Sequence, residues 1–163
     1  MIYFWSTLGE YGAFSQWYEC DFVDFEGVKY NCAEQYMMYQ KAKLFGDEEV
    51  AQEILNESNP KNIKALGRKI KNFNQQVWDE NKFNIVVRGN YHKFTQNNDL
   101  AYLLLKTWGE DIAEASPFDK IWGIGIDENA AVSGMPWRGE NLLGEALMKV
   151  RRMIRMKSQG IEL

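Results

Sequence analysis

The hydrophobic pattern of the chain begins with short apolar runs that are typical of strands. Residues 2–5 form one run, and residues 19–23 and 28–30 form two more on either side of Glu26-Gly27. A turn dipeptide between two alternating runs is typical of a β-hairpin, so we expect the second and third runs to pair. The segment between the first strand and this hairpin, residues 9–16, is rich in turn formers.

The pattern then changes to a helical period. Asn31 followed by Glu34 resembles a capping box, and Gly46 is a typical helix stop, so we expect a helix between them. Asp47 predicts the start of a second helix that runs to about residue 56. Asn59-Pro60 predicts a third, because proline fits the first turn of a helix.

The remainder of the chain is again mostly helical in pattern. We expect a long helix over 75–96, which is either continuous or interrupted near Gly89, and then a helix from Asn98 or Asp99 to Gly109. Two strands are expected next, over 111–115 and 121–126. A loop over 127–139 and a final amphipathic helix over 141–157 complete the chain. The prediction is therefore a predominantly helical α+β fold, with a short N-terminal hairpin and small additional strands.

The length of 163 residues fits one domain, and the sequence has neither an internal repeat nor a linker rich in Pro, Gly or Ser. We expect a single domain over residues 1–163. A net charge of −4 argues against a general nucleic-acid-binding protein, since such domains are usually basic. The charge is uneven: residues 1–57 hold 11 acidic and 3 basic side chains, and residues 58–163 hold 12 acidic and 16 basic ones. The basic portion suits a phosphorylated small molecule, or is a set of solvated helix faces.

Several classes of protein are excluded or disfavoured by composition. No segment approaches the ~18 consecutive apolar residues that span a bilayer. The first residues lack a basic leader with an apolar core, so we expect a cytoplasmic protein. Two cysteines, Cys20 and Cys32, and the single His92 do not form a zinc pattern. A structural disulfide is disfavoured in a reducing compartment. We expect no metal and no cofactor.

The spacing of Glu34 and Lys41 places both on one face of the predicted first helix, nearly two turns apart. A solvated charged face is the ordinary explanation for such a pair. In a cleft, however, the carboxylate is suited to acid or base chemistry, and burial lowers the pKa of a lysine. The glycines of Gly123-Ile124-Gly125 indicate a close backbone approach to a ligand or a strand, not a dinucleotide motif, because the third glycine is missing. The basic residues of the last helix read as an outward face.

Seven segments taken in order resemble one family, the NADAR superfamily (NAD and ADP-ribose associated), which is also called the YbiA-like or riboflavin-intermediate N-glycosidase family. They span nearly the whole chain. The segments are 14–17 (FSQW), 34–42 (EQYMMYQKA), 66–68 (LGR), 93–97 (KFTQN), 114–117 (EASP), 119–125 (DKIWGIG) and 141–144 (NLLG).

The resemblance implies an α-rich fold with a pocket for a ribose phosphate that is joined through nitrogen to a base. Family members hydrolyse N-glycosidic bonds, some in early riboflavin-pathway intermediates and others between ADP-ribose and guanine. The implied catalytic residues are Glu34, Lys41 and Asp119. The implied substrate-binding residues are Trp17, Arg68, Trp78, Lys93, Glu114, Trp122, Gly123 and Asn141.

Two positions depart from the pattern of some glycosidase members. Gln35 stands where some have His, and Ile124 stands where some have Asp, although many relatives share the Trp-Gly-Ile-Gly form. Both differences bear on a riboflavin-type substrate more than on the fold. The expected partner is a small ribosyl-phosphate or ADP-ribosyl substrate, with ADP-ribosylated DNA a further candidate.

Two other classes of function compete with the enzyme. A module that binds ADP-ribose or an NAD derivative without turnover needs the same phosphate clamp and aromatic walls. A purely structural interaction protein makes the shared Trp and Asn positions incidental. The pair of Glu34 and Lys41 favours the enzyme, because binding alone does not require it. Glu34 is then the acid/base and Lys41 a nucleophile or an electrostatic aid.

Overall fold

The computed structural model describes residues 1–160, and their backbone contacts divide into two compact units. One unit holds residues 16–97. The other holds residues 1–15 together with the segment from Asn98 onward. The helix-rich composition with few short strands confirms the predicted α+β class. Along residues 1–160, no helix combines the length and the apolar character that a bilayer crossing requires.

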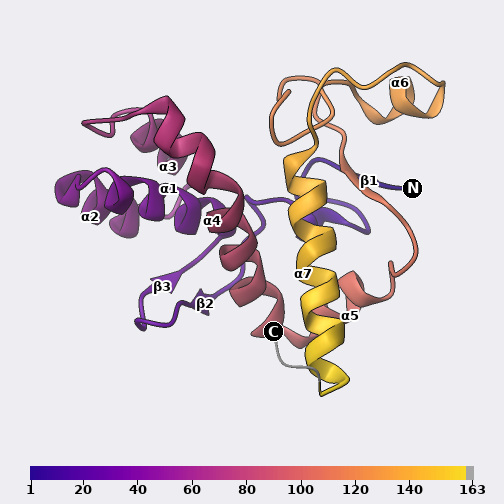
Figure 1. Ribbon diagram of the computed structural model, residues 1–163, viewed down its shortest axis with the longest axis horizontal. Coiled ribbons are helices and arrows are strands. Elements are labelled where there is room, and N and C mark those ends of the chain that lie inside the picture. The colour runs from indigo at the N-terminus through magenta and orange to yellow at the C-terminus, as the bar shows by residue number, and fades with distance from the viewer. Residues whose placement is uncertain (161–163) are drawn as a thin grey trace. The chain divides into compact units, whose positions relative to one another are not determined.

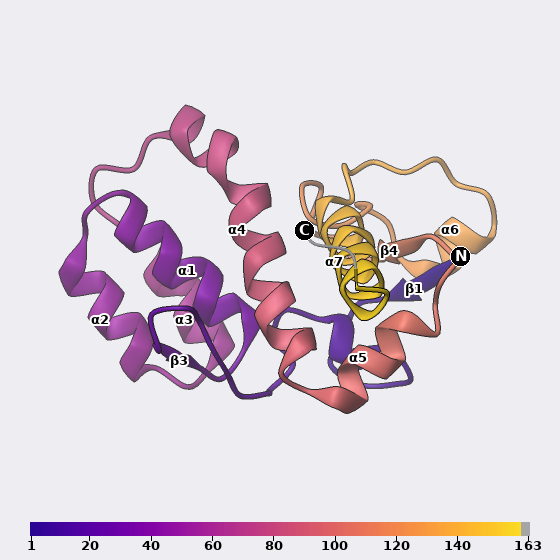
Figure 2. The same cartoon turned by 60° about the horizontal axis from the view of Figure 1, so that its bottom comes forward.

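The unit of residues 16–97 is built around helix α1 (Ala33–Leu44), which contacts α2 (Glu48–Asn56), α3 (Pro60–Gly67) and α4 (Gln75–Thr95) (Figure 1, Figure 2). The helix has an unbroken run of buried residues from Ala33 to Met38, so all sides of its first turns face protein. Two helical glycines allow the close approach. A Cβ at Gly67 would collide with Met38, and one at Gly89 would lie 2.5 Å from the Tyr36 ring.

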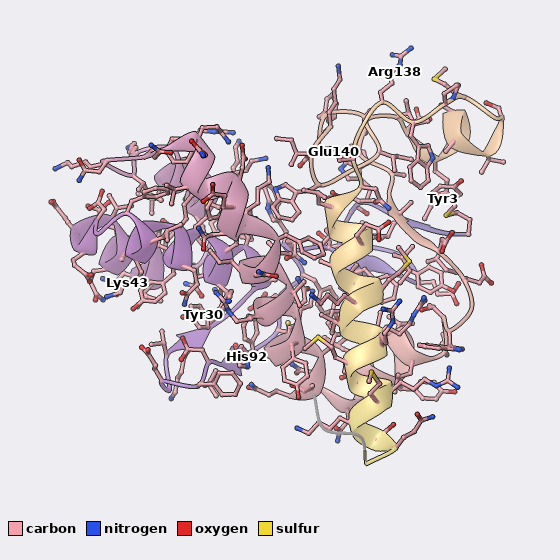
Figure 3. All side chains as sticks on the ribbon, in the orientation of Figure 1. Tyr3, Tyr30, Lys43, His92, Arg138 and Glu140 are labelled. Atoms are coloured by element: carbon pink, nitrogen blue, oxygen red, sulfur yellow. The ribbon has the colours of Figure 1, made fainter. Side chains whose placement is uncertain are left out.

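The predicted hairpin lies beside these helices. Strands β2 (Phe22–Val23) and β3 (Lys29–Tyr30) are antiparallel, with Phe22 opposite Tyr30. The turn is held by the Asp24 carboxylate, which accepts hydrogen bonds from the backbone N–H groups of Glu26 and Val28 at 2.9 and 3.0 Å. Tyr30 and His92, both labelled in Figure 3, contact the ring of Tyr36 with centroid distances of 5.1 and 6.0 Å.

The other unit pairs the start of the chain with a distant strand. Strand β1 (Ile2–Phe4) lies parallel to β4 (Ile112–Glu114), with Phe4 opposite Glu114. Helix α7 (Leu142–Ser158) packs against β4 and against α5 (Asn98–Leu105). A short 3₁₀ helix, η1 (Gly12–Phe14), stands in the turn-rich segment.

The predicted helix starts at Asp47 and Asn59-Pro60 are confirmed, since both side chains accept hydrogen bonds from the first turns of α2 and α3. The long fourth helix is continuous through Gly89, where the glycine serves packing and not a break. The predicted cap of α1 is wrong: Cys32 occupies the N-cap position, and the Asn31 amide instead donates to the carbonyl of Ser58 at 3.2 Å.

Two predictions between β4 and α7 are also wrong. Residues 121–126 form a loop and not a strand, because the backbone of Ile124 pairs with two separate segments, donating to Glu114 and accepting from Arg138, each at 2.8 Å. Gly125 has a φ of 74°, which ends any extended run. Ile124 and Ile126 are apolar because they lie in the buried cluster beside β4. The predicted loop over 127–139 contains a short helix, α6 (Glu128–Val132), capped by Asp127.

Substitution of Gly89 by alanine tests the close packing of α1 and α4. In an unobstructed helix this change stabilises by about 1 kcal/mol. Here the new methyl group meets the buried Tyr36 ring, and overpacking costs about 1–3 kcal/mol. We expect Gly89→Ala to lower the free energy of unfolding by about 1 kcal/mol, measured by urea denaturation.

The control is Glu53→Ala on the exposed face of α2, which we expect to change stability by less than about 0.5 kcal/mol. A stabilised Gly89→Ala protein would contradict the packing described for α1 and α4.

Candidate active site

The first turn of α1 carries Glu34 into the interior of its unit. The backbone N–H of Glu34 donates to the carbonyl of Gln16 at 2.9 Å, which fixes the start of the helix against the preceding segment. The Glu34 residue is only 8% exposed. A carboxylate at such a position is costly unless neighbouring groups compensate it. Its charge acts on two neighbours, Cys32 and Lys41.

Lys41 lies on the same helix, with its ammonium between aromatic rings. Its Nζ atom is 4.8 Å from the ring centroid of Phe73 and 5.3 Å from that of Trp78. Burial lowers the pKa of Lys41; Glu34 opposes that change, and the Arg68 guanidinium adds to it. Glu34, Lys41, Arg68 and Trp78 therefore form one electrostatic and aromatic cluster, which we call the α1 cluster together with Phe73.

Phe73 is the member of the α1 cluster that the sequence did not indicate. It lies in the turn between α3 and α4, directly after Asn72, whose φ is 61°. Its ring also makes an edge contact with Phe45, at a centroid distance of 5.3 Å. Phe73 is 43% exposed, whereas Trp78 is buried, so Phe73 offers the larger accessible aromatic surface beside Lys41.

Lys93 is enclosed within the same unit. It is 0% exposed, and burial lowers its pKa to about 8, although the thiols of Cys20 and Cys32 oppose the change. Its Nζ atom lies 5.2 Å from the ring centroid of Phe94 and 5.8 Å from that of Tyr18. Trp17, the residue before Tyr18, is exposed. In this structure Lys93 is thus surrounded by protein, while Trp17 is accessible.

The remaining predicted residues lie in the other unit, around the end of β4. Asp119 folds the loop that carries Trp122: its Oδ1 atom accepts the backbone N–H groups of Ile121 and Trp122 at 2.9 and 2.8 Å. A Cβ at Gly123 would lie 2.9 Å from the carbonyl oxygen of Asp119 and 3.0 Å from that of Glu114. Gly123 is therefore required where this loop crosses the end of the strand.

Asn141 holds β4 with both atoms of its amide. Its Nδ2 donates to the carbonyl of Ile112 at 2.9 Å, and its Oδ1 accepts the N–H of Glu114 at 3.0 Å. The residue is 1% exposed and adopts a left-handed backbone conformation with a φ of 55°. The loop that leads into Asn141 contains Arg138 and Glu140, both labelled in Figure 3. Its backbone N–H groups donate to carbonyls of residues 120–124. The Asn141 side chain thus makes the hydrogen bonds to β4 that a neighbouring strand would otherwise make.

The structure brings the predicted residues together in two sets, one in each unit. The first set is Glu34, Lys41, Arg68 and Trp78, with Trp17 and Lys93 elsewhere in the same unit. The second is Glu114, Asp119, Trp122, Gly123 and Asn141. The first set combines a buried carboxylate, an amine of lowered pKa and an exposed guanidinium. These groups are suited to acid/base or covalent chemistry on an anionic substrate. Within the described part of the chain, no group of His, Cys, Asp or Glu side chains could hold a metal ion.

A family model described as the NADAR domain matches residues 3–155. The chain belongs to the NADAR domain family. N-glycosidase R617 from Acanthamoeba polyphaga mimivirus is 49% identical over 145 residues, which cover 85% of each protein. N-glycosidase Npun_R5314 from Nostoc punctiforme is 31% identical over 156 residues, which cover 94% of this chain and 92% of that protein. The NMR structure of the E. coli protein YbiA matches with a TM-score of 0.81 at 26% identity, covering 99% of this chain and 89% of that one.

These relatives place the chain among the hydrolases that act on N-glycosyl compounds. The likeness to the YbiA structure agrees with the α+β class of the NADAR family and extends over both units. No individual site residue is assigned by these matches, so the α1 cluster rests on its own geometry.

The charge of Glu34 is expected to hold up the pKa of Lys41 in this NADAR domain. Removing that charge in Glu34→Gln leaves burial and Arg68, which both lower the pKa, so it falls further. More of the amine is then neutral at pH 7, and Lys41 is acylated faster. Quantitative mass spectrometry after brief acylation measures this rate, with exposed Lys61 as the internal reference.

The matched control is Glu53→Gln, an exposed carboxylate of α2. It is expected to leave the labelling of Lys41 unchanged. Slower or equal labelling of Lys41 in Glu34→Gln would show that the two side chains do not interact.

Asn141 supports β4 in our interpretation, and its stability effect separates this role from substrate binding. Each buried backbone group left unsatisfied costs about 1–3 kcal/mol, so Asn141→Gly is expected to lose about 3 kcal/mol of unfolding free energy. Asn141→Ala is expected to lose about 1 kcal/mol more, because a Cβ is strained in the left-handed conformation. Denaturation of both variants measures this, and near-wild-type stability of both would contradict the supporting role.

Proposed function

We propose that this NADAR protein hydrolyses the N-glycosidic bond between a phosphorylated ribose or ADP-ribose and a nucleobase-like amine. The observation that carries the proposal is the α1 cluster: a buried Glu34 carboxylate and a desolvated Lys41 amine on one helix. The N-glycosidases among the relatives support the reaction class. Binding alone needs neither a buried acid nor an amine of lowered pKa.

Glu34 is the proposed acid/base. A base-like amine leaves ribose C1 poorly unless its nitrogen gains a proton as the bond breaks. The Glu34 carboxylate takes a proton from the attacking water and passes it to that nitrogen as the bond breaks. Acid/base catalysis of this kind accelerates reactions by about 10²–10⁴-fold. Water adds to C1, the base departs with one proton, and Glu34 returns to its starting state.

Lys41 has two proposed roles that experiment separates. In direct displacement its ammonium stabilises charge near the ribose. In the covalent route, which requires an exocyclic glycosidic nitrogen, the ribose opens to an imine and the neutral Lys41 amine attacks C1. The base is then expelled, a Schiff base to lysine remains, and water hydrolyses it. The lowered pKa of Lys41 favours the neutral amine that this route needs.

The remaining residues of the proposal bind and position. Arg68 is exposed beside Lys41 and suits a phosphate, which a guanidinium grips with two parallel hydrogen bonds. Phe73 and Trp17 offer exposed aromatic surface for the base, with Trp78 behind Lys41. Lys93 as a phosphate ligand stays a prediction, since the side chain is enclosed here.

In the unit that contains β4, we propose Glu114, Trp122 and Gly123 as substrate contacts. Asp119 as a catalytic group also stays a prediction, and its bonds to the loop favour the positioning of Trp122. Asn141 is proposed to act through β4 and not through the substrate. We also propose that the protein acts in the cytoplasm and needs no cofactor.

Gln35 favours an ADP-ribosylated substrate over a riboflavin-type one. Its Nε2 donates to the carbonyls of Ile54 and Glu57, each at 3.0 Å, and its Oε1 accepts the N–H of Asn31 at 2.8 Å. The amide at the position where some glycosidases have His is therefore committed to joining α1, α2 and the hairpin. The residue is 3% exposed, so its amide is not accessible to a substrate.

The experiment is a product assay on three substrates: riboflavin-pathway intermediates, an ADP-ribosylated guanine oligonucleotide and NAD. Mass spectrometry is expected to detect free base, with the guanine oligonucleotide turned over fastest. Calorimetry with ADP-ribose is run in parallel. Binding without release of base from any of the three would instead identify a sensor or sequestering module and contradict the proposal.

Borohydride trapping tests the role of Lys41. If the covalent route operates, borohydride added during turnover reduces the Schiff base and attaches ribose to Lys41 of the wild type, while Lys41→Ala stays unlabelled. Peptide mapping by mass spectrometry locates the label, and Lys43→Ala on the exposed side of α1 is the control. Equal labelling of Lys41→Ala would remove the covalent route, and no labelling of an active wild type would select direct displacement.

A further inference from the structure

The start of α1 brings a pair of thiols beside the enclosed amine of Lys93. Cys20 and Cys32 lie on the two arms that continue from the hairpin, and Lys93 comes from α4. The charge of Lys93 acts on Cys32, and both thiols act on Lys93. Neither thiol has a role in the proposed hydrolysis.

The hairpin keeps its two arms together as far as the two cysteines. Phe22 pairs with Tyr30 and Val23 with Lys29, and the two arms continue beyond these pairs to Cys20 and Cys32. The backbone N–H of Cys20 donates to the carbonyl of Asn31 at 3.0 Å, so Cys20 lies against the peptide bond that joins Asn31 to Cys32.

Backbone segments joined by such a hydrogen bond lie about 4.7–4.9 Å apart. This lies within the range of about 4.4–6.8 Å that disulfides span. We propose that Cys20 and Cys32 form a reversible intramolecular disulfide on exposure to a peroxide, with Lys93 as the base that receives the proton of the Cys32 thiol.

The two thiols differ in the way that such a reaction requires. Cys20 is partly exposed, so peroxide reaches it first. Cys32 is 1% exposed, and burial raises its pKa to about 11, although the Gln35 backbone N–H and the Lys93 charge oppose the rise. Cys32 is therefore protonated at neutral pH and needs a base before it attacks. The Lys93 amine, with a pKa of about 8, is suited to that task.

The reaction balances with hydrogen peroxide as the oxidant. The Cys20 sulfur attacks one peroxide oxygen, the O–O bond breaks, and a sulfenic acid and water form. The Cys32 sulfur then attacks the Cys20 sulfur while its proton passes to Lys93. The S–S bond forms, the S–O bond breaks, and hydroxide leaves and takes a proton from Lys93 to become the second water. Two thiols and one peroxide give one disulfide and two waters.

The disulfide would link Cys32, the N-cap residue of α1, covalently to Cys20. Glu34 lies two residues beyond Cys32, so the redox state of the pair reaches the proposed acid/base; this consequence, unlike the modification itself, rests on the proposed function.

The test follows the mass of the full chain. Protein is treated with hydrogen peroxide, alkylated with N-ethylmaleimide and analysed by mass spectrometry without reduction. The expected product has lost two hydrogen atoms, carries no alkyl group and yields one cross-linked peptide containing Cys20 and Cys32. Dithiothreitol restores two alkylatable thiols. Because this measurement does not depend on turnover, its failure is distinct from failure of the proposed hydrolysis.

Matched variants assign the roles. Cys32→Ser, which keeps a good N-cap, is expected to stop at a Cys20 sulfenic acid that dimedone traps. Lys93→Arg keeps the positive charge but lacks a neutral amine, and its cross-link is expected to form about 100-fold more slowly. Alkylation of both thiols after peroxide treatment, a disulfide between two chains, or a product that links Lys93 to sulfur would each overturn the proposal. An undiminished rate in a folded Lys93→Arg protein would remove Lys93 as the base.

Discussion

The burial of α1 is the constraint on which the site in residues 16–97 depends. The first turns of α1, from Ala33 to Met38, are buried on every side, so each polar residue there needs a partner within the protein. Gln35 satisfies this by bonding to the ends of α2 and to the hairpin. Glu34, one residue earlier, is held near Lys41 and Cys32. The same packing that stabilises the unit therefore buries the Glu34 carboxylate and lowers the pKa of the Lys41 amine.

The unit that contains β4 depends on backbone geometry more than on buried charge. Gly123, Gly139 and Gly144 lie where a Cβ would strike neighbouring backbone atoms. Asn141 replaces a missing neighbour strand with its amide. The backbone of this loop has little conformational freedom, so Trp122 is held in a fixed position within its unit. The NADAR segments over 119–125 and 141–144 thus have a structural reason to occur together, because the backbone N–H groups of the second donate to the carbonyls of Ile121, Trp122 and Gly123 in the first.

Local signals in the sequence were sufficient for most helices. Asp47 and Asn59-Pro60 start helices through their own side chains, and the spacing of Glu34 and Lys41 gave their common face. Predictions failed where distant contacts decide the outcome. The apolar residues of 121–126 are buried by packing beside β4 without strand pairing. Cys32 replaced Asn31 at the cap because Asn31 bonds to Ser58, far along the chain. The contact of Phe73 with Lys41 and the enclosure of Lys93 likewise depend on how the helices pack, which no local pattern reports.

In the proposed reaction, the buried carboxylate of Glu34 takes a proton from water and transfers it to the departing base. Single-turnover kinetics of Glu34→Gln, with calorimetry on the same protein, tests this most directly. We predict that the variant binds ADP-ribose with nearly wild-type affinity, while release of the base slows by about 10²–10⁴-fold. Release at the wild-type rate from a folded Glu34→Gln protein would contradict the account and place the acid/base elsewhere.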